Sequence, residues 1–230
     1  MKTMKARMYL AFEGWMLVFL LALSIAFLND FFVGTILFKT AASLFFVLAG
    51  VCGYIRNREN RRFSRFMLMG FICCMAGDVF LALDSQGMIF VIGVASFAAA
   101  HVLFVAAFCS ICAATKADIA MAFAVFVCLV LVLCLGNFDF QGLLPVLIGY
   151  AAVISFMVVK ALSLWRCRQK GQYGVMLIML GGVLFLLSDV ILLFWLFGID
   201  AAKEVQVWNW VVYYLAQGCL TAALNKKWGT

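Results

Sequence analysis

Two aspartates lie deep inside long apolar runs of the sequence, where an ionised side chain is costly. If its run is helical, Asp78 lies roughly 18 Å from the start at about 1.5 Å per residue, and Asp189 is similarly deep in its own run. A side chain this short does not reach a membrane surface, so each must be protonated, hydrogen-bonded or hydrated. Two carboxyls in unlike surroundings can share acid catalysis, since one donates a proton while its ionised partner stabilises a cation and orients water. We therefore predict a functional role for both; the alternative is a pair of polar contacts between helices.

The surroundings of the two aspartates repeat. Residues 77–81 and residues 188–192 both read small, Asp, Val, large apolar, Leu. Both segments belong to odd-numbered members of the series of apolar runs, so both cross a membrane in the same direction. The repeat favours two four-helix halves related by an axis along the membrane normal, with the two aspartates facing each other across the bundle.

Three more ionisable side chains lie within the apolar runs. His101 is the sole histidine and follows small residues, so we expect it to face the interior. Lys39 either extends its long side chain to the interface or pairs with an aspartate or a substrate phosphate. Glu13 lies near one end of its run, where interfacial water explains it as well as function does. His101 and the two aspartates lack the ligand spacing of a metal site, so we predict neither a metal nor a cofactor.

A polar group lies in the last apolar run. Tyr213, Tyr214 and Gln217 fall within about one helical turn, and the first and last of them share a face. A buried glutamine needs partners, so we predict pocket residues here rather than an aromatic belt at the interface. Elsewhere, Cys109 and Cys112 form a C-x-x-C pair, which without a second cluster is a weak metal or redox signal.

The composition predicts the elements that must position these residues. Hydrophobic residues make up 68% of the 230 positions and charged residues 12%, too few charges to cover a water-soluble fold of this length. Lipid must therefore contact most of the surface, which leaves helices or closed barrels. The apolar runs are continuous rather than alternating, so we predict an all-α integral membrane protein with eight transmembrane helices in a single domain, 1–230. The predicted helices span residues 8–28, 31–55, 66–83, 88–113, 119–135, 143–165, 173–199 and 207–224.

Basic residues gather in alternate connections. One set of connections and the C-terminus hold Arg56, Arg58, Arg61, Arg62, Arg65, Lys116, Arg166, Arg168, Lys170, Lys226 and Lys227. The other set holds Asp30, Asp84, Asp139, Asp200 and Glu204, opposed by Lys203. Because short cytoplasmic loops are rich in Lys and Arg, we expect a multi-pass cell-membrane protein with both termini in the cytoplasm. The net charge of +7 then indicates anionic headgroups as a partner, and no nucleic-acid motif is present.

The order and spacing of four motifs resemble the YhhN-like family of membrane lysoplasmalogenases over nearly the whole chain. The family pattern reads roughly GD-x-x-L, F-x-x-A-H-x-x-Y/F, S-D and Y-x-x-A-Q. The matching residues here are Gly77-Asp78-Val79-Phe80-Leu81, Phe97-Ala98-Ala99-Ala100-His101-Val102-Leu103-Phe104, Ser188-Asp189 and Tyr213-Tyr214-Leu215-Ala216-Gln217. The resemblance implies eight spans and hydrolysis of the vinyl ether bond of a lysophospholipid substrate, with Asp78 and Asp189 as catalytic acids and His101 and Lys39 as pocket residues. One position departs from the pattern: Thr40 follows the lysine, where the family usually has proline.

Two other classes of function use the same residues. A proton-coupled transporter would relay protons through the aspartates, but it favours helices broken by Gly or Pro, and Pro145, the single proline, lies near a helix start. A non-enzymatic membrane protein would use the polar residues as contacts between helices. We predict a hydrolase that yields a fatty aldehyde and a glycerophospho-base, and release of aldehyde separates it from both alternatives.

Overall fold

The computed structural model describes residues 2–84, 87–170, 172–199 and 201–226. Within these ranges the chain is α-helical, apart from one short 3-10 helix and an isolated bridge between Phe138 and Gly198. The helices are α1 Lys2–Leu28, α2 Phe32–Arg56, α3 Arg61–Leu83, α4 Met88–Ile111, α5 Lys116–Leu135, α6 Leu144–Ser163, the 3-10 helix η1 Leu164–Lys170, α7 Gln172–Phe197 and α8 Lys203–Asn225. The all-α prediction is confirmed. Of the charges used above, Asp200 and Lys227 lie outside the described residues.

Seven helices in the described ranges, α1 to α7, are long and apolar enough to cross a membrane. The chain is thus built as a multi-pass membrane protein. The helix outside this group is α8, whose first two turns carry Lys203, Glu204, Gln206 and Asn209. These polar side chains lower its mean hydropathy, although its length matches that of its neighbours.

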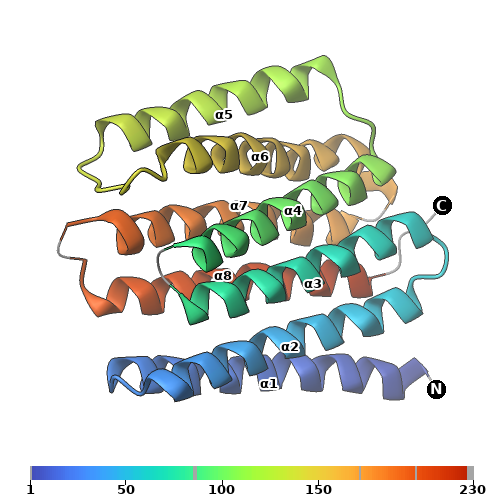
Figure 1. The fold of residues 1–230 in the computed structure, drawn as a ribbon. Coiled ribbons are helices and arrows are strands. Elements are labelled where there is room, and N and C mark those ends of the chain that lie inside the picture. The colour runs from blue at the N-terminus through green and yellow to red at the C-terminus, as the bar shows by residue number, and fades with distance from the viewer. Residues whose placement is uncertain (1, 85–86, 171, 200, 227–230) are drawn as a thin grey trace.

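The helices alternate in direction and form one bundle (Figure 1). Consecutive helices pair as α1 with α2, α3 with α4, α5 with α6 and α7 with α8. Two helices connect these pairs, since α2 also packs against α3 and α8, while α6 also packs against α4 and α7. Both ends of the chain lie at the same end of the bundle as the α2–α3 and α4–α5 connections, as the alternation requires.

Several helix ends differ from the predicted ones because polar caps, rather than hydropathy, set them. α3 begins at Arg61 instead of residue 66, since the Asn60 side chain accepts a hydrogen bond from the Phe63 N–H. α5 begins at Lys116 instead of 119, behind a capping box formed by Thr115 and Asp118. α1 and α8 begin at Lys2 and Lys203, before the predicted residues 8 and 207, because both start with charged turns that a hydropathy pattern omits.

Three helices end earlier than predicted. α4 ends at Ile111 because Cys112 has extended backbone angles, and α6 ends at Ser163 where the 3-10 helix η1 takes over. α7 ends at Phe197, beyond which the Gly198 backbone pairs with Phe138. At each of these ends the backbone changes conformation and finds other hydrogen-bond partners, as the last carbonyls of a helix require.

Close packing of α3 on α4 forms the centre of the core. Phe71, Phe104 and Phe108 are fully buried, and the Phe71 and Phe104 rings meet edge to face at 5.6 Å. A Cβ at Gly70 would stand 2.4 Å from the Phe104 ring, so the glycine allows the two helices to approach. Small residues at such contacts are typical of helices packed in lipid.

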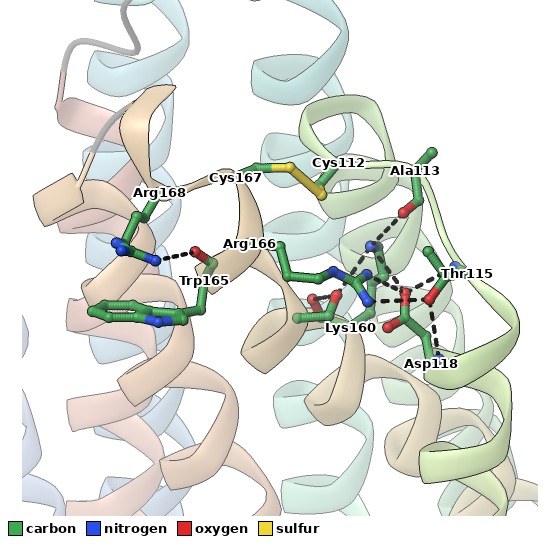
Figure 2. Close-up of a disulfide and its surroundings, with 10 residues drawn as sticks. Cys112, Ala113, Thr115, Asp118, Lys160, Trp165, Arg166, Cys167 and Arg168 are labelled. Atoms are coloured by element: carbon green, nitrogen blue, oxygen red, sulfur yellow. Dashed lines mark hydrogen bonds and ion pairs between the residues drawn. A yellow bond between two sulfur atoms is a disulfide. The ribbon is translucent and has the colours of Figure 1, made fainter.

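A disulfide joins two connections at the end of the bundle that holds both termini. Cys112, after α4, bonds to Cys167 in η1, 55 residues away, while Cys109 remains a free thiol. Figure 2 also shows Asp118, at the start of α5, which accepts from Arg166 Nη2 at 2.8 Å and lies 3.5 Å from Lys160 Nζ. The C-x-x-C pair noted in the sequence thus contributes its second cysteine to a different partner.

Candidate functional site

The bundle contains an open cavity of about 390 Å³ with largely apolar walls. Asp78 and Asp189 both line it, as do Lys39 and Tyr213. The volume falls within the range of small-molecule sites. The two acidic side chains, which come from α3 and α7, are therefore placed around one common space.

Asp78 is held by three donors at once. Its Oδ1 lies 3.4 Å from Lys39 Nζ, and its Oδ2 accepts from Ser43 Oγ at 2.7 Å and from Tyr213 Oη at 2.8 Å. The Lys39 and Asp78 side chains are 8% and 3% exposed, so the pair is shielded from bulk water. A carboxylate accepts hydrogen bonds only, whereas a protonated acid would need a place for its own proton. The surroundings of Asp78 therefore suit its ionised form.

Asp189 has a different environment. Its Oδ2 accepts from Tyr150 Oη at 2.6 Å and lies 3.6 Å from His101 Nε2. The same tyrosine oxygen lies 2.8 Å from His101 Nε2. Since the Tyr150 proton goes to Asp189, we assign the Nε2–H tautomer to His101, which then donates to Tyr150. The Oδ1 atom of Asp189 has no hydrogen bond to the described part of the chain, so it is free to meet a ligand.

One aromatic side chain connects the two acidic groups. The Phe185 ring meets the Tyr213 ring at 5.4 Å and the His101 ring at 4.7 Å, both edge to face. Tyr213 donates to Asp78, and His101 donates to the tyrosine that holds Asp189. Phe185 thus forms a rigid apolar spacer, which keeps the two carboxyls in separate surroundings within the same cavity.

The structure sorts the predicted pocket residues into two layers. Lys39 and Tyr213 line the cavity, whereas His101, Tyr214 and Gln217 lie behind its wall. Tyr214 Oη donates to the Lys39 backbone carbonyl at 3.1 Å, and Gln217 is fully buried next to the Cys74 thiol. These inner side chains position the wall rather than extend into the cavity, and their part in function stays a prediction.

Sequence reasoning missed Ser43 and Tyr150, although each donates a short hydrogen bond to one of the aspartates. Tyr150 carried a usable signal, because a tyrosine hydroxyl inside an apolar helix needs a partner. Ser43 carried none, because a helical serine can bond to the carbonyl four residues earlier, as Ser43 also does with Lys39 at 3.0 Å.

Glu13 lies apart from the cavity. Its carboxyl accepts from Thr221 Oγ1 and joins α1 to α8. This contact explains the glutamate as a polar link between helices. Within the described ranges, no group of three or more His, Cys, Asp or Glu side chains is arranged to hold a metal ion.

The fold and the cavity define a multi-pass α-helical membrane protein with two aspartates in a shared buried site. The chain belongs to the YhhN family, whose profile matches residues 34–224, a stretch that includes every residue described around the two aspartates. No curated protein and no solved structure matches the chain.

Proposed function

We propose that this protein hydrolyses the vinyl ether bond of lysoplasmalogens and releases a fatty aldehyde and a glycerophospho-base. The unequal hydrogen bonding of Asp78 and Asp189 around one apolar cavity carries the proposal. Vinyl ether cleavage needs a proton donor to carbon and a base for water, and carboxyls in unlike surroundings supply this combination. The resemblance to membrane lysoplasmalogenases in four motifs supports the same reaction.

Asp189 is the proposed general acid. Asp189 lines the cavity, and its Oδ1 has no hydrogen bond to the described part of the chain, so a proton on this oxygen is available to a ligand. The proton is transferred to the double-bond carbon that is not bonded to oxygen. This leaves an oxocarbenium cation at the other carbon of the former double bond, which is bonded to the ether oxygen. Tyr150 keeps its hydrogen bond to Oδ2, which stabilises Asp189 as it becomes negative.

Asp78 is the proposed base. Water adds to the oxocarbenium carbon and gives its proton to Asp78, whose charge Lys39 balances in the resting site. The resulting hemiacetal then breaks its carbon–oxygen bond, so that the glycerol oxygen leaves as an alcohol and the aldehyde forms. One water is consumed, and both carboxyls recover their starting protonation through proton exchange with water.

The cavity walls suit a substrate with one hydrocarbon chain. Leu129, Leu133, Leu147, Ile154 and Leu186 line the cavity from α5, α6 and α7. Burial of a methylene group against such a wall stabilises the complex by about 0.8 kcal/mol relative to water. A long alkenyl chain therefore binds here with its ether near the carboxyls.

The same proposal includes the topology. We place α8 as the eighth span, because it pairs with α7 along the bundle and has a comparable length. The packing of α2 on α3 and α8 corresponds to that of α6 on α7 and α4, as two related halves α1–α4 and α5–α8 require. Both termini are assigned to the cytoplasm.

The direct test is aldehyde release from 1-alkenyl-lysophosphoethanolamine by the purified protein, followed by a coupled alcohol dehydrogenase. We expect the wild type to form aldehyde and Asp189→Asn to lower kcat by roughly 10²- to 10⁴-fold, because an amide does not deliver the proton. Asp78→Asn is expected to act similarly, since it removes the base.

Asp139→Asn is the matched control, because Asp139 lies in the connection before α6 and its Oδ1 accepts from the Gln141 N–H there. It should retain wild-type turnover. Absence of aldehyde from the wild type would refute the hydrolase, and normal turnover in Asp189→Asn would remove that residue from the mechanism.

A further inference from the structure

Two polar atoms in the cavity wall have no partner within the described chain. They are Gln206 Oε1 and Trp210 Nε1. Both residues line the cavity, and they are 7% and 3% exposed. Because they are four residues apart on α8, they share one face of that helix.

A buried polar group without a hydrogen bond destabilises the fold. Among the described residues that carry such unpartnered atoms, Gln206 and Trp210 are the ones that line the cavity. The amide oxygen of Gln206 accepts and the indole N–H of Trp210 donates. A hydroxyl group does both, so one hydroxyl can satisfy the two atoms together. The pair is a site for a ligand hydroxyl rather than for a charged group.

The positions of Gln206 and Trp210 along α8 determine where a bound hydroxyl would lie relative to Asp78 and Asp189. Trp210 precedes Tyr213, the donor to Asp78, by three residues, or about 4.5 Å along the helix. Gln206 lies one turn further toward Asp30, which also lines the cavity and whose side chain is 77% exposed. Asp30 therefore marks the mouth, and the pair lies between the mouth and the catalytic carboxyls.

We propose that Gln206 and Trp210 recognise the free glycerol hydroxyl of a single-chain lysolipid. This inference rests on the proposed function, because it requires the ether of the same ligand to lie at Asp78 and Asp189. In a lysoplasmalogen the hydroxyl is on the carbon next to the one that carries the alkenyl ether. It donates to Gln206 Oε1 and accepts from Trp210 Nε1.

The recognition selects against two-chain lipids. In these the same oxygen is acylated and has no proton, so Gln206 Oε1 would stay unpaired while a second chain crowds the wall. A site that leaves a buried polar group unpaired rejects the wrong ligand strongly. The headgroup then points to the mouth, where Asp30 and Lys203 form an ion pair and present both signs of charge to a zwitterion.

The test compares two ligands that differ in this hydroxyl alone and carry no vinyl ether. The probes are 1-O-hexadecyl-glycero-3-phosphocholine and its 2-deoxy analogue, both tritiated, with binding measured to protein in lipid nanodiscs after subtraction of empty discs. We expect the wild type to bind the hydroxyl probe about tenfold more tightly. In Gln206→Met, which keeps the shape and removes the acceptor, the ratio should fall to about one.

Trp210→Phe should also reduce the ratio, and it provides a second test if Gln206→Met does not fold. Trp208→Phe is the control, since Trp208 is on the same helix but 63% exposed outside the cavity wall. Equal binding of both probes to the wild type, or an unchanged ratio in Gln206→Met and Trp210→Phe, would overturn the inference. Binding needs no catalysis, so selectivity without aldehyde release would refute the hydrolase alone, and aldehyde release without selectivity would refute the hydroxyl site alone.

Discussion

At the scale of single residues, the number of hydrogen-bond donors separates the two aspartates. Asp78 accepts from Ser43 and Tyr213 and pairs with Lys39, whereas among the described residues Tyr150 alone donates a hydrogen bond to Asp189. The proposed catalytic roles are assigned from the hydrogen bonds that each carboxyl still lacks. Asp189 has an oxygen without a protein donor that is available to a ligand. Asp78 has Lys39 beside it, and this cation stays there when Asp78 takes a proton from water in the proposed reaction.

Tyr150 is expected to position Asp189 rather than to react. In Tyr150→Phe the carboxyl loses its hydrogen bond and the hydroxyl that bridges it to His101, which then lies beside it at 3.6 Å without a bridge. We predict that kcat for aldehyde release falls about tenfold, because one hydrogen bond to a charged group contributes roughly 1.5 to 3 kcal/mol and part of it is replaced by water. KM should change little, since the hydroxyl is bonded to protein and not directed to the substrate.

The comparison variant is Tyr173→Phe, at an exposed position near the start of α7. It should have wild-type kcat and KM. Wild-type kcat in Tyr150→Phe would show that Asp189 is oriented by other contacts, whereas a rise in KM alone would place the tyrosine hydroxyl on the substrate.

The ionisable side chains of the site could be recognised from the sequence, but the side chains that hydrogen-bond to them or line the cavity could not. Asp78, Asp189, His101 and Lys39 conflict with an apolar run and are visible for that reason. Ser43, Tyr150 and Trp210 fit such a run, because a hydroxyl or an indole is tolerated in a helix that packs against others, and Gln206 directly precedes the last predicted run. Which of them turn toward the cavity depends on the packing of α8 and α6 against distant helices, which a single sequence does not contain.

At the scale of elements, the bundle depends on close approach of α3 and α4. Gly70→Ala would place a methyl group against the fully buried Phe104 ring. We predict a loss of about 1 to 3 kcal/mol of stability, the usual effect of overpacking, seen as a lower Tm in thermal unfolding of the detergent-solubilised protein. Gly14→Ala in α1 meets nothing within 4 Å and should leave Tm unchanged or slightly raised.

An equal Tm for both glycine variants would mean that Phe104 moves aside without cost, and that small residues do not set the α3–α4 distance.

The spans themselves were predictable, since each is a continuous apolar run, but their ends were not. Asn60 and Thr115 cap helices by specific side-chain bonds, and hydropathy gives no weight to such bonds.

At the scale of the whole molecule, the cavity lies where all four helix pairs meet, and the repeated aspartate motif had predicted only that the two aspartates face each other across the bundle. Asp78 and Asp189 come from α3 and α7, the corresponding helices of the two proposed halves, and both line that cavity. Their surroundings have diverged, since Lys39 is beside one and Tyr150 beside the other. Unlike surroundings of this kind are what the proposed acid and base roles require.

The basic residues and the disulfide indicate opposite orientations of this bundle in the membrane. Basic side chains gather at the end that holds both termini, which indicates the cytoplasm. The Cys112–Cys167 bond lies at the same end, and disulfides persist in oxidising compartments. The basic excess acts during insertion, whereas the bond forms afterwards in whatever compartment the loops have reached, so we take the charges as decisive.

We therefore predict that Cys112 and Cys167 are thiols in intact cells and form the bond on oxidation after lysis. Acid-quenched cells alkylated with N-ethylmaleimide should yield little of the linked peptide in mass spectrometry, while oxidised membranes should yield it readily. A C-terminal alkaline phosphatase fusion should be inactive, and a fluorescent protein at the same site should fluoresce. A linked peptide in quenched cells together with an active phosphatase would invert the topology, and the mouth at Asp30 would then face the cytoplasm, so that substrate would enter from that side.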